Sequence, residues 1–329
     1  MFLGTATVDA VSDLKLHNQT DNVRNSRTRT IALCALVLQN TSIILFSNFS
    51  HRPDAAIYRM SSVVAAAEVL KLLFCCCVVF LCPGSTSQPS FLRNFKEYRA
   101  LAIPSSLYVV QNNAQFIAIQ CLSPVVYIVL SQAKILTTAI FSVLLFGTAL
   151  NKRKCTALLL LAFGLVFINI PPGSGVGRGQ SSCYNGGLLA SAVAAITSGF
   201  SSVFLELCFK KGNVSLWERN IQLGIFSVPI AWVSGLFDPE RSTCSIFGGF
   251  DGIVICVVFL QAAGGIVVAH VIKHADSIIK NFSVAVSICT CTLYTMCVNH
   301  IPLTPPVMIG VSSVILSVFM YSLASRNEQ

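Results

Sequence analysis

Ten runs of about 20 predominantly apolar residues follow one another along this chain, and they constrain its fold more than any other feature. A helix of about 20 residues crosses the hydrocarbon core of a bilayer, which is roughly 30 Å thick. The connections between the runs are short, so no separate soluble domain fits between them. The sequence therefore predicts an all-α polytopic membrane protein. The predicted spans are residues 30–49, 59–82, 101–121, 124–146, 155–170, 186–208, 216–237, 249–272, 278–298 and 303–323.

Composition agrees with this class. Of the 329 residues, 54% are hydrophobic and 11% are charged, and the mean hydropathy is +0.73. Soluble domains carry about 25% charged residues, so this chain is not a soluble domain. Residues 1–29 are polar and are predicted to form a disordered tail, and residues 324–329 a short one. The membrane domain is expected to occupy residues 30–323.

The positions of Lys and Arg predict the orientation. If the N-terminus is cytosolic, fifteen of these residues fall on the cytosolic side and four on the lumenal side. Positive residues favour cytosolic loops, so we expect ten spans with both termini in the cytosol. The net charge of +9 then needs no nucleic-acid partner, because the basic loops account for it.

The loop at residues 171–182 divides the chain into two sets of five spans, residues 30–170 and 184–323. An odd number of spans in each half forces the second half to run opposite to the first. Such inverted repeats are common in transporters, where the substrate site lies near the bilayer midplane between them. The sequence thus predicts two inverted five-helix repeats that rock against each other.

The fourteen cysteines do not indicate a disulfide framework, because most lie in apolar runs, where Cys behaves as a small hydrophobic residue. Cys183 and Cys244 are exceptions. They lie near the starts of two predicted spans on the same side, which leaves a disulfide between them open.

Charged residues within the spans are costly in lipid and are usually paired or functional. Glu68 and Lys71 are three residues apart on one helical face, and an internal ion pair explains them. Lys134 has no acid in its own span. It either pairs with Glu68 or Glu206 on another helix, or it awaits an anionic ligand. Glu206 also has a partner four residues away in its own span, and that pair is expected to be structural.

Amide and hydroxyl side chains cluster in the third and fourth spans. Tyr108, Asn112 and Gln115 share one face of a helix, with Asn113 beside them. In the next span, Tyr127 and Lys134 lie on one face. These amides are too many for one packing seam and predict a polar cavity.

The segment from Phe259 to Ser287 combines paired glycines with a charged hinge. Gly264 and Gly265 allow a neighbouring backbone or a ligand to approach the helix closely. Lys273, His274, Asp276 and Lys280 then concentrate charge between two apolar runs. The alternative is a packing notch beside an ordinary cytosolic turn.

Four motifs together resemble the nucleotide-sugar transporters of the Golgi and endoplasmic reticulum, within the drug/metabolite transporter superfamily. They are YVVQNN from Tyr108, YIVLSQAK from Tyr127, the segment from Ser198 that contains SLWERNIQL, and GGIVVAHVIKHADSIIKNF from Gly264. Three positions depart from the family pattern: Phe204 and His274 replace Tyr, and Asn281 replaces Gly.

The resemblance implies an antiporter, not an enzyme, that imports a UDP-sugar, UDP-galactose or UDP-N-acetylglucosamine, in exchange for UMP. The alternatives are a CMP-sialic acid transporter or a carrier for another phosphorylated anion. The expected location is the Golgi membrane, or else that of the endoplasmic reticulum; a homodimer is left open, and no cofactor or metal is expected. The expected substrate-binding residues are Tyr108, Asn112, Asn113, Tyr127, Lys134, Asn220, Gln222, Gln261, Gly264, Gly265, Lys273 and His274.

Overall fold

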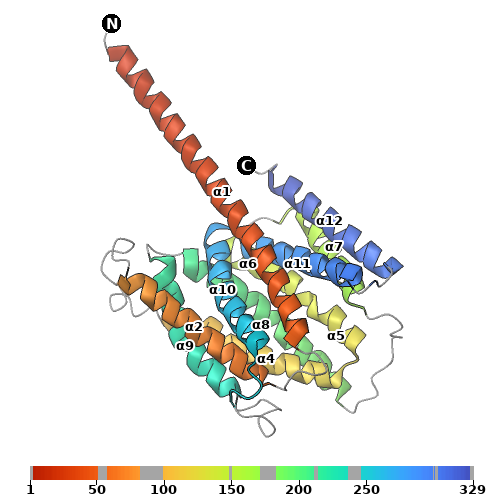
Figure 1. Ribbon diagram of the computed structural model, residues 1–329. Helices are drawn as coiled ribbons and strands as arrows, with labels where there is room; N and C mark the ends of the chain where they lie inside the picture. The colour runs from red at the N-terminus through yellow and green to blue at the C-terminus, as the bar shows by residue number, and fades with distance from the viewer. Residues whose placement is uncertain are drawn as a thin grey trace.

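The structure is a computed structural model, and it describes residues 3–50, 58–81, 99–147, 150–170, 183–210, 214–235, 246–298, 300 and 303–326. All regular secondary structure in these ranges is helical (Figure 1). The helices are α1 (Leu3–Ser50), α2 (Met60–Leu81), α4 (Ala102–Cys121), α5 (Pro124–Ser131), α6 (Ala133–Phe146), α7 (Lys152–Asn169), α8 (Tyr184–Lys210), α9 (Leu216–Ser234), α10 (Gly252–His274), α11 (Ser277–Val298) and α12 (Pro305–Arg326).

Each predicted span contains a helix, and α5 and α6 share the fourth. Seven segments of the described chain are long and apolar enough to cross a membrane, so the protein is a multi-pass membrane protein. They belong to α1, α2, α5 with α6, α8, α10, α11 and α12. The helices α4, α7 and α9 do not qualify by this criterion. They carry the amides of α4, the basic start of α7 and the Glu-Arg-Asn sequence of α9, which lower their hydropathy.

The N-terminal segment, for which the sequence predicts a disordered tail, is drawn out as helix in the structure. In the structure α1 continues without a break back to Leu3, and its N-terminal part extends away from the bundle (Figure 1). Residues 5–50 contain neither Gly nor Pro, the two residues that most readily end a helix. The polar stretch therefore extends the first spanning helix.

Helices distant in sequence make the main contacts of the bundle. The most extensive contacts join α7 with α12, α4 with α8, α1 with α10, α2 with α9 and α6 with α8. The largest apolar cluster lies among α6, α7, α11 and α12, and includes Leu158, Leu161 and Ile135, each at most 2% exposed. Contacts within the lipid depend on close packing, because the bilayer itself is as apolar as these side chains.

Two glycines allow α7 and α12 to touch backbone to backbone. A Cβ atom on Gly164 would lie 2.8 Å from the carbonyl oxygen of Gly310, and a Cβ on Gly310 would lie 2.8 Å from that of Gly164. The contact is therefore reciprocal. Any side chain at either position would push the two helices apart.

A disulfide between Cys121 and Cys183 joins the end of α4 to the start of α8, with their Cα atoms 5.4 Å apart. The suggested pair of Cys183 with Cys244 is therefore wrong, and Cys244 lies outside the described residues. Gly187, one turn after Cys183, explains why Cys121 is the partner of Cys183. A Cβ atom on Gly187 would lie 2.8 Å from the Cys121 side chain, so only glycine allows the two helices to come this close. The absence of a side chain brings α8 against the end of α4.

We predict that Gly164→Ala lowers the melting temperature of the purified protein in detergent. The added Cβ meets a backbone oxygen and Val314 at 2.8 and 2.9 Å, so the helices must shift, at a cost of about 1–3 kcal/mol. Gly186→Ala is the matched control, because a Cβ there meets nothing within 4 Å. Equal melting temperatures for the two variants would contradict the packing role of Gly164.

Candidate functional site

Glu68 and Glu206, the two acids considered as partners for Lys134, already have basic partners. Lys71 of α2 contacts both carboxylate oxygens of Glu68, at 2.7 and 2.6 Å, and its side chain is only 6% exposed. Ser227 of α9 donates a hydrogen bond to the same carboxylate. The expected internal ion pair is confirmed, and Glu68 is not the partner of Lys134.

A second network joins α8 to the hinge between α10 and α11. Lys210 Nζ contacts Glu206 at 2.6 Å and Asp276 at 2.8 Å, and the other Glu206 oxygen accepts a hydrogen bond from Ser277 N at 2.8 Å. The side chain of Glu206 is 3% exposed. This confirms the structural role expected for the Glu206–Lys210 pair and removes Glu206 as a partner for Lys134.

Lys134 therefore has no ion pair among the residues that the structure describes. Its side chain is exposed, near the start of α6. The backbone around Lys134 has hydrogen bonds that span three residues instead of four. Gln132 N donates to Val129 O at 3.2 Å, and Ile135 N donates to Gln132 O at 3.0 Å. These three-residue bonds form a short 3₁₀-type turn, a feature that often marks a functional position in a helix.

Lys280 of α11 is the lysine that lies close to Lys134. Its charge interacts with those of Lys134 and Glu206, and its Nζ donates to Ser202 Oγ of α8 at 2.8 Å. The sequence indicates for Lys280 only a charge of the cytosolic hinge, and Lys280 is not one of the expected binding residues. Its spacing contained a usable signal, since a lysine three residues after Ser277 lies on the first turn of α11, inside the span.

The polar side chains of α4 and α5 lie on neighbouring helices. Tyr108 is 46% exposed, Asn112 is half-buried, and Asn113 donates to Val109 O of its own helix at 2.9 Å. Tyr127 packs against a cluster that includes Ala114, one residue after Asn113. The structure thus brings Tyr127 to the amide-bearing turn of α4, and their contact with substrate stays a prediction.

Asn220 and Gln222 are buried in the first turns of α9, at 1% and 5% exposure. Asn220 donates to Leu216 O at 2.9 Å, and Gln222 Oε1 accepts from Arg219 at 3.2 Å. These bonds lie within the helix itself. The expected presentation of the two amides to a ligand stays a prediction.

The glycine pair of α10 contacts side chains of two other helices. A Cβ on Gly264 would collide with the amide of Gln39 of α1, which donates to Leu260 O at 3.0 Å. A Cβ on Gly265 would meet Lys71 Cδ at 2.8 Å. Both glycines therefore make room for side chains of neighbouring helices, which is the packing notch that the sequence offers as the alternative to a ligand site. Gln261 is half-buried nearby on α10.

Lys273 and His274 are the last two residues of α10, directly before the hinge that carries Asp276. His274 is exposed, and its ring centroid lies 4.6 Å from that of His270. Lys273 is close enough to interact electrostatically with both histidines. The part of the chain that the structure describes contains no group of three or more residues suited to hold a metal ion.

Lys134 has no ion pair in the described part of the chain and lies near a second lysine, which makes the two candidates for binding an anion. A phosphate group offers several oxygen acceptors, and charge-assisted hydrogen bonds to lysine are stronger than neutral ones. In a multi-pass membrane protein, intramembrane cations of this kind mark solute pathways. Fold and site together define a membrane carrier for an anionic solute.

Comparison with known proteins gives the family. The chain matches the nucleotide-sugar transporter family over residues 24–322, and it belongs to that family. It is 34% identical over 321 residues to a UDP-N-acetylglucosamine/UDP-N-acetylgalactosamine transporter of Caenorhabditis elegans, covering 91% of this chain and 95% of the relative. The human UDP-galactose translocator is 34% identical over 325 residues, covering 95% and 82%. The human UDP-N-acetylglucosamine transporter is 34% identical over 307 residues, covering 88% and 94%.

These relatives are transporters, which confirms that the chain is not an enzyme. A solved crystal structure shares the fold with a TM-score of 0.69, at 14% sequence identity, over 92% of this chain and 99% of the other. The resemblance found in the motifs is therefore confirmed at the level of the family.

We predict that Glu206→Gln destabilises the protein, because it leaves Lys210 with Asp276 alone. The expected loss is roughly 2 kcal/mol, less than for a fully buried pair, since a third of Lys210 is exposed. The melting temperature in detergent measures it. Lys134→Met is the control and should leave the melting temperature unchanged, and an equal loss in both variants would contradict the assignment of roles.

Proposed function

We propose that this protein carries a UDP-sugar, UDP-galactose or UDP-N-acetylglucosamine, across the membrane in exchange for UMP. The observation that supports this most directly is the positive charge of Lys134, which has no ion pair among the described residues and has Lys280 close enough to interact with it. The two ammonium groups contact the phosphates in this proposal. Tyr108, Tyr127 and the amides of Asn112 and Asn113 contact the uracil and ribose.

The named relatives support uridine nucleotides as substrates. The three compared above are named for UDP-galactose, UDP-N-acetylglucosamine or UDP-N-acetylgalactosamine. The diphosphate and the uridine are common to these molecules, and the charged and amide groups described here suit that shared portion. The sugar differs between these molecules, and none of the groups described here is assigned to it.

Inverted repeats of five spans each are supported by the way the helices pack. In this proposal the first half consists of α1, α2, α4, α5 with α6, and α7, and the second half of α8 to α12. Exchange of the halves means that each helix is replaced by the helix at the same place in the other half. The α4–α8 contact then becomes the α10–α1 contact. The exchange also converts α6–α8 into α11–α1 and α2–α10 into α9–α4. All six contacts are present. The α2–α9 and α7–α12 contacts are unchanged by the exchange, as expected for pairs on a pseudo-twofold axis.

In this proposal the carrier is closed at the end of the bundle where α8 meets α9. There Phe209 and Leu216, at the α8–α9 junction, are 4% and 8% exposed against Ala269 and Ile272 of α10. The Glu206–Lys210–Asp276 network reinforces this contact. The corresponding junction of the first half, between α1 and α2, runs through residues 51–57, which lie outside the described residues.

We propose that the closed end is cytosolic. The excess of Lys and Arg on that side supports this orientation. The Cys121–Cys183 disulfide at the opposite end supports it independently, because disulfides persist in the oxidising lumen of the secretory pathway. Both termini are then cytosolic, the carrier is open toward the lumen, and the Golgi membrane is the proposed location.

We predict that Lys134→Ala and Lys280→Ala each weaken UMP binding by tenfold or more, because a charge-assisted hydrogen bond contributes about 1.5–3 kcal/mol. Binding to the purified protein is measured by calorimetry, and the melting temperature without nucleotide reports on the fold. Lys152→Ala, at the exposed start of α7, is the matched control. Unchanged affinity in both site variants would overturn the phosphate assignment.

We predict that UMP inside proteoliposomes accelerates the entry of labelled UDP-sugar several-fold over empty vesicles. The empty carrier has to enclose two uncompensated lysines in a low-dielectric interior, whereas bound phosphate neutralises them. CMP inside the vesicles is the control and should accelerate entry far less. Equal rates with empty and UMP-loaded vesicles would exclude obligate exchange.

A further inference from the structure

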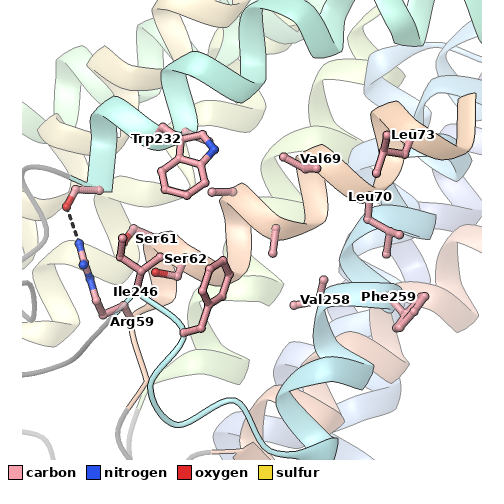
Figure 2. A pocket seen from close by; sticks show the side chains of 15 residues that line it. Arg59, Ser61, Ser62, Val69, Leu70, Leu73, Trp232, Ile246, Val258 and Phe259 are labelled. Carbon is pink, nitrogen blue, oxygen red and sulfur yellow. Dashed lines mark hydrogen bonds between the residues drawn. The ribbon is translucent and has the colours of Figure 1, made fainter. Parts of the chain in front are cut away.

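A hollow of about 530 Å³ lies between α2, α9 and the start of α10, within the range of about 300–1,000 Å³ that is usual for small-molecule sites. Most of its lining is aliphatic or aromatic, including Val69, Leu73, Trp232 and Phe259 (Figure 2). We refer to it as the α2–α9 groove. Val69 and Leu73 are among the residues of α2 that line the groove, whereas Glu68 and Lys71 are not.

The groove is open to the outside of the bundle. Leu73 and Phe259 are each 58% exposed, Trp232 is 46% exposed, and Phe247 at the rim is 62% exposed. In a protein that crosses the membrane, exposed apolar side chains at helix faces lie against lipid. The natural occupant of such an opening is therefore an apolar chain from the bilayer.

Arg59 provides a cation at one end of this apolar groove. One of its terminal nitrogens donates to Gly235 O at 2.7 Å, as Figure 2 shows, while its Nε has no hydrogen-bond partner. The residue is only 8% exposed. A buried guanidinium nitrogen without a partner is costly, and an acceptor oxygen at this position would remove that cost.

The position of Arg59 along the membrane fits a lipid headgroup. It precedes the first residue of α2, and Gly235 follows the last residue of α9, so the guanidinium lies at the level where the two helices end. Phosphate groups of glycerophospholipids occupy this level of a bilayer, and acyl chains extend from it toward the midplane. The groove extends in the same direction, from Arg59 past Val69 to Leu73.

We propose that the α2–α9 groove binds one glycerophospholipid, with its phosphate at Arg59 and an acyl chain along Val69, Leu73 and Trp232. The headgroup phosphate accepts hydrogen bonds from the guanidinium of Arg59, and the chain fills the space between α2 and α9. This site is separate from Lys134 and Lys280, and it does not depend on which nucleotide sugar is carried. Because α2 and α9 are the pair on the proposed pseudo-twofold axis, a lipid here bridges both halves of the chain.

The test uses the full-length protein in liposomes that contain phosphatidylserine with a photoreactive diazirine in its acyl chain. After irradiation, peptides from residues 61–73 and 246–259 should carry most of the covalently attached lipid. Val69→Trp fills the groove and should reduce this labelling by roughly tenfold, the change that corresponds to about 1.4 kcal/mol of binding free energy. Leu144→Trp is the control and should not change it, since Leu144 is 71% exposed on α6, outside the groove.

A second variant tests the headgroup contact. Arg59→Gln should reduce the labelling, and Arg59→Lys should restore part of it, at equal amounts of folded protein. Labelling spread evenly over all the outer helices, or unchanged in Val69→Trp, would overturn the proposal and indicate ordinary contact with the bilayer. Full competition by inorganic phosphate would also overturn it, because the groove would then hold a free anion rather than a lipid.

Discussion

The distribution of ion pairs within the bilayer is the constraint on which the rest of this structure depends. A charge in hydrocarbon costs roughly 2.5–3.5 kcal/mol on insertion scales, so each intramembrane acid needs a partner. Glu68 has Lys71 and Ser227, and Glu206 has Lys210 and Ser277 N. Because both carboxylates have other partners, Lys134 has no ion pair in the described part of the chain. The proposed anion site rests on this unpaired charge.

Glycine positions make these pairs and contacts geometrically feasible. Gly265 makes room for the stem of Lys71, so the buried ion pair of α2 depends on a residue of α10. Gly199 has the same role between α8 and α6, where a Cβ would meet the backbone nitrogen of Thr138 at 2.7 Å. Lipid offers little hydrophobic drive for helix association, so close approach supplies much of it through van der Waals contact. The electrostatic arrangement and the packing of this protein are therefore not independent.

Much of the fold followed from the sequence because helix length and hydropathy are local properties. Each predicted span contains a helix, and the Glu68–Lys71 and Glu206–Lys210 pairs were predictable from spacings of three and four residues. The features that the sequence did not predict depend on contacts between distant segments. Cys121 became the partner of Cys183 through the approach of α8 at Gly187, and Lys280 became a neighbour of Lys134 through the packing of α11 on α6. No spacing along the chain contains that information.

The Cys121–Cys183 disulfide joins a helix of the first sequence half to a helix of the second. The helix α8 also packs closely on α6, while α1 packs on α10 and α11. These helices thus form two closely packed groups, each with members from both halves of the chain: α4, α6 and α8 in one, and α1, α10 and α11 in the other. The disulfide keeps the end of α4 at the start of α8, so any movement of one sequence half against the other would have to pivot about this point. The close packing in this carrier is interleaved along the chain and does not follow the boundary between its two sequence halves.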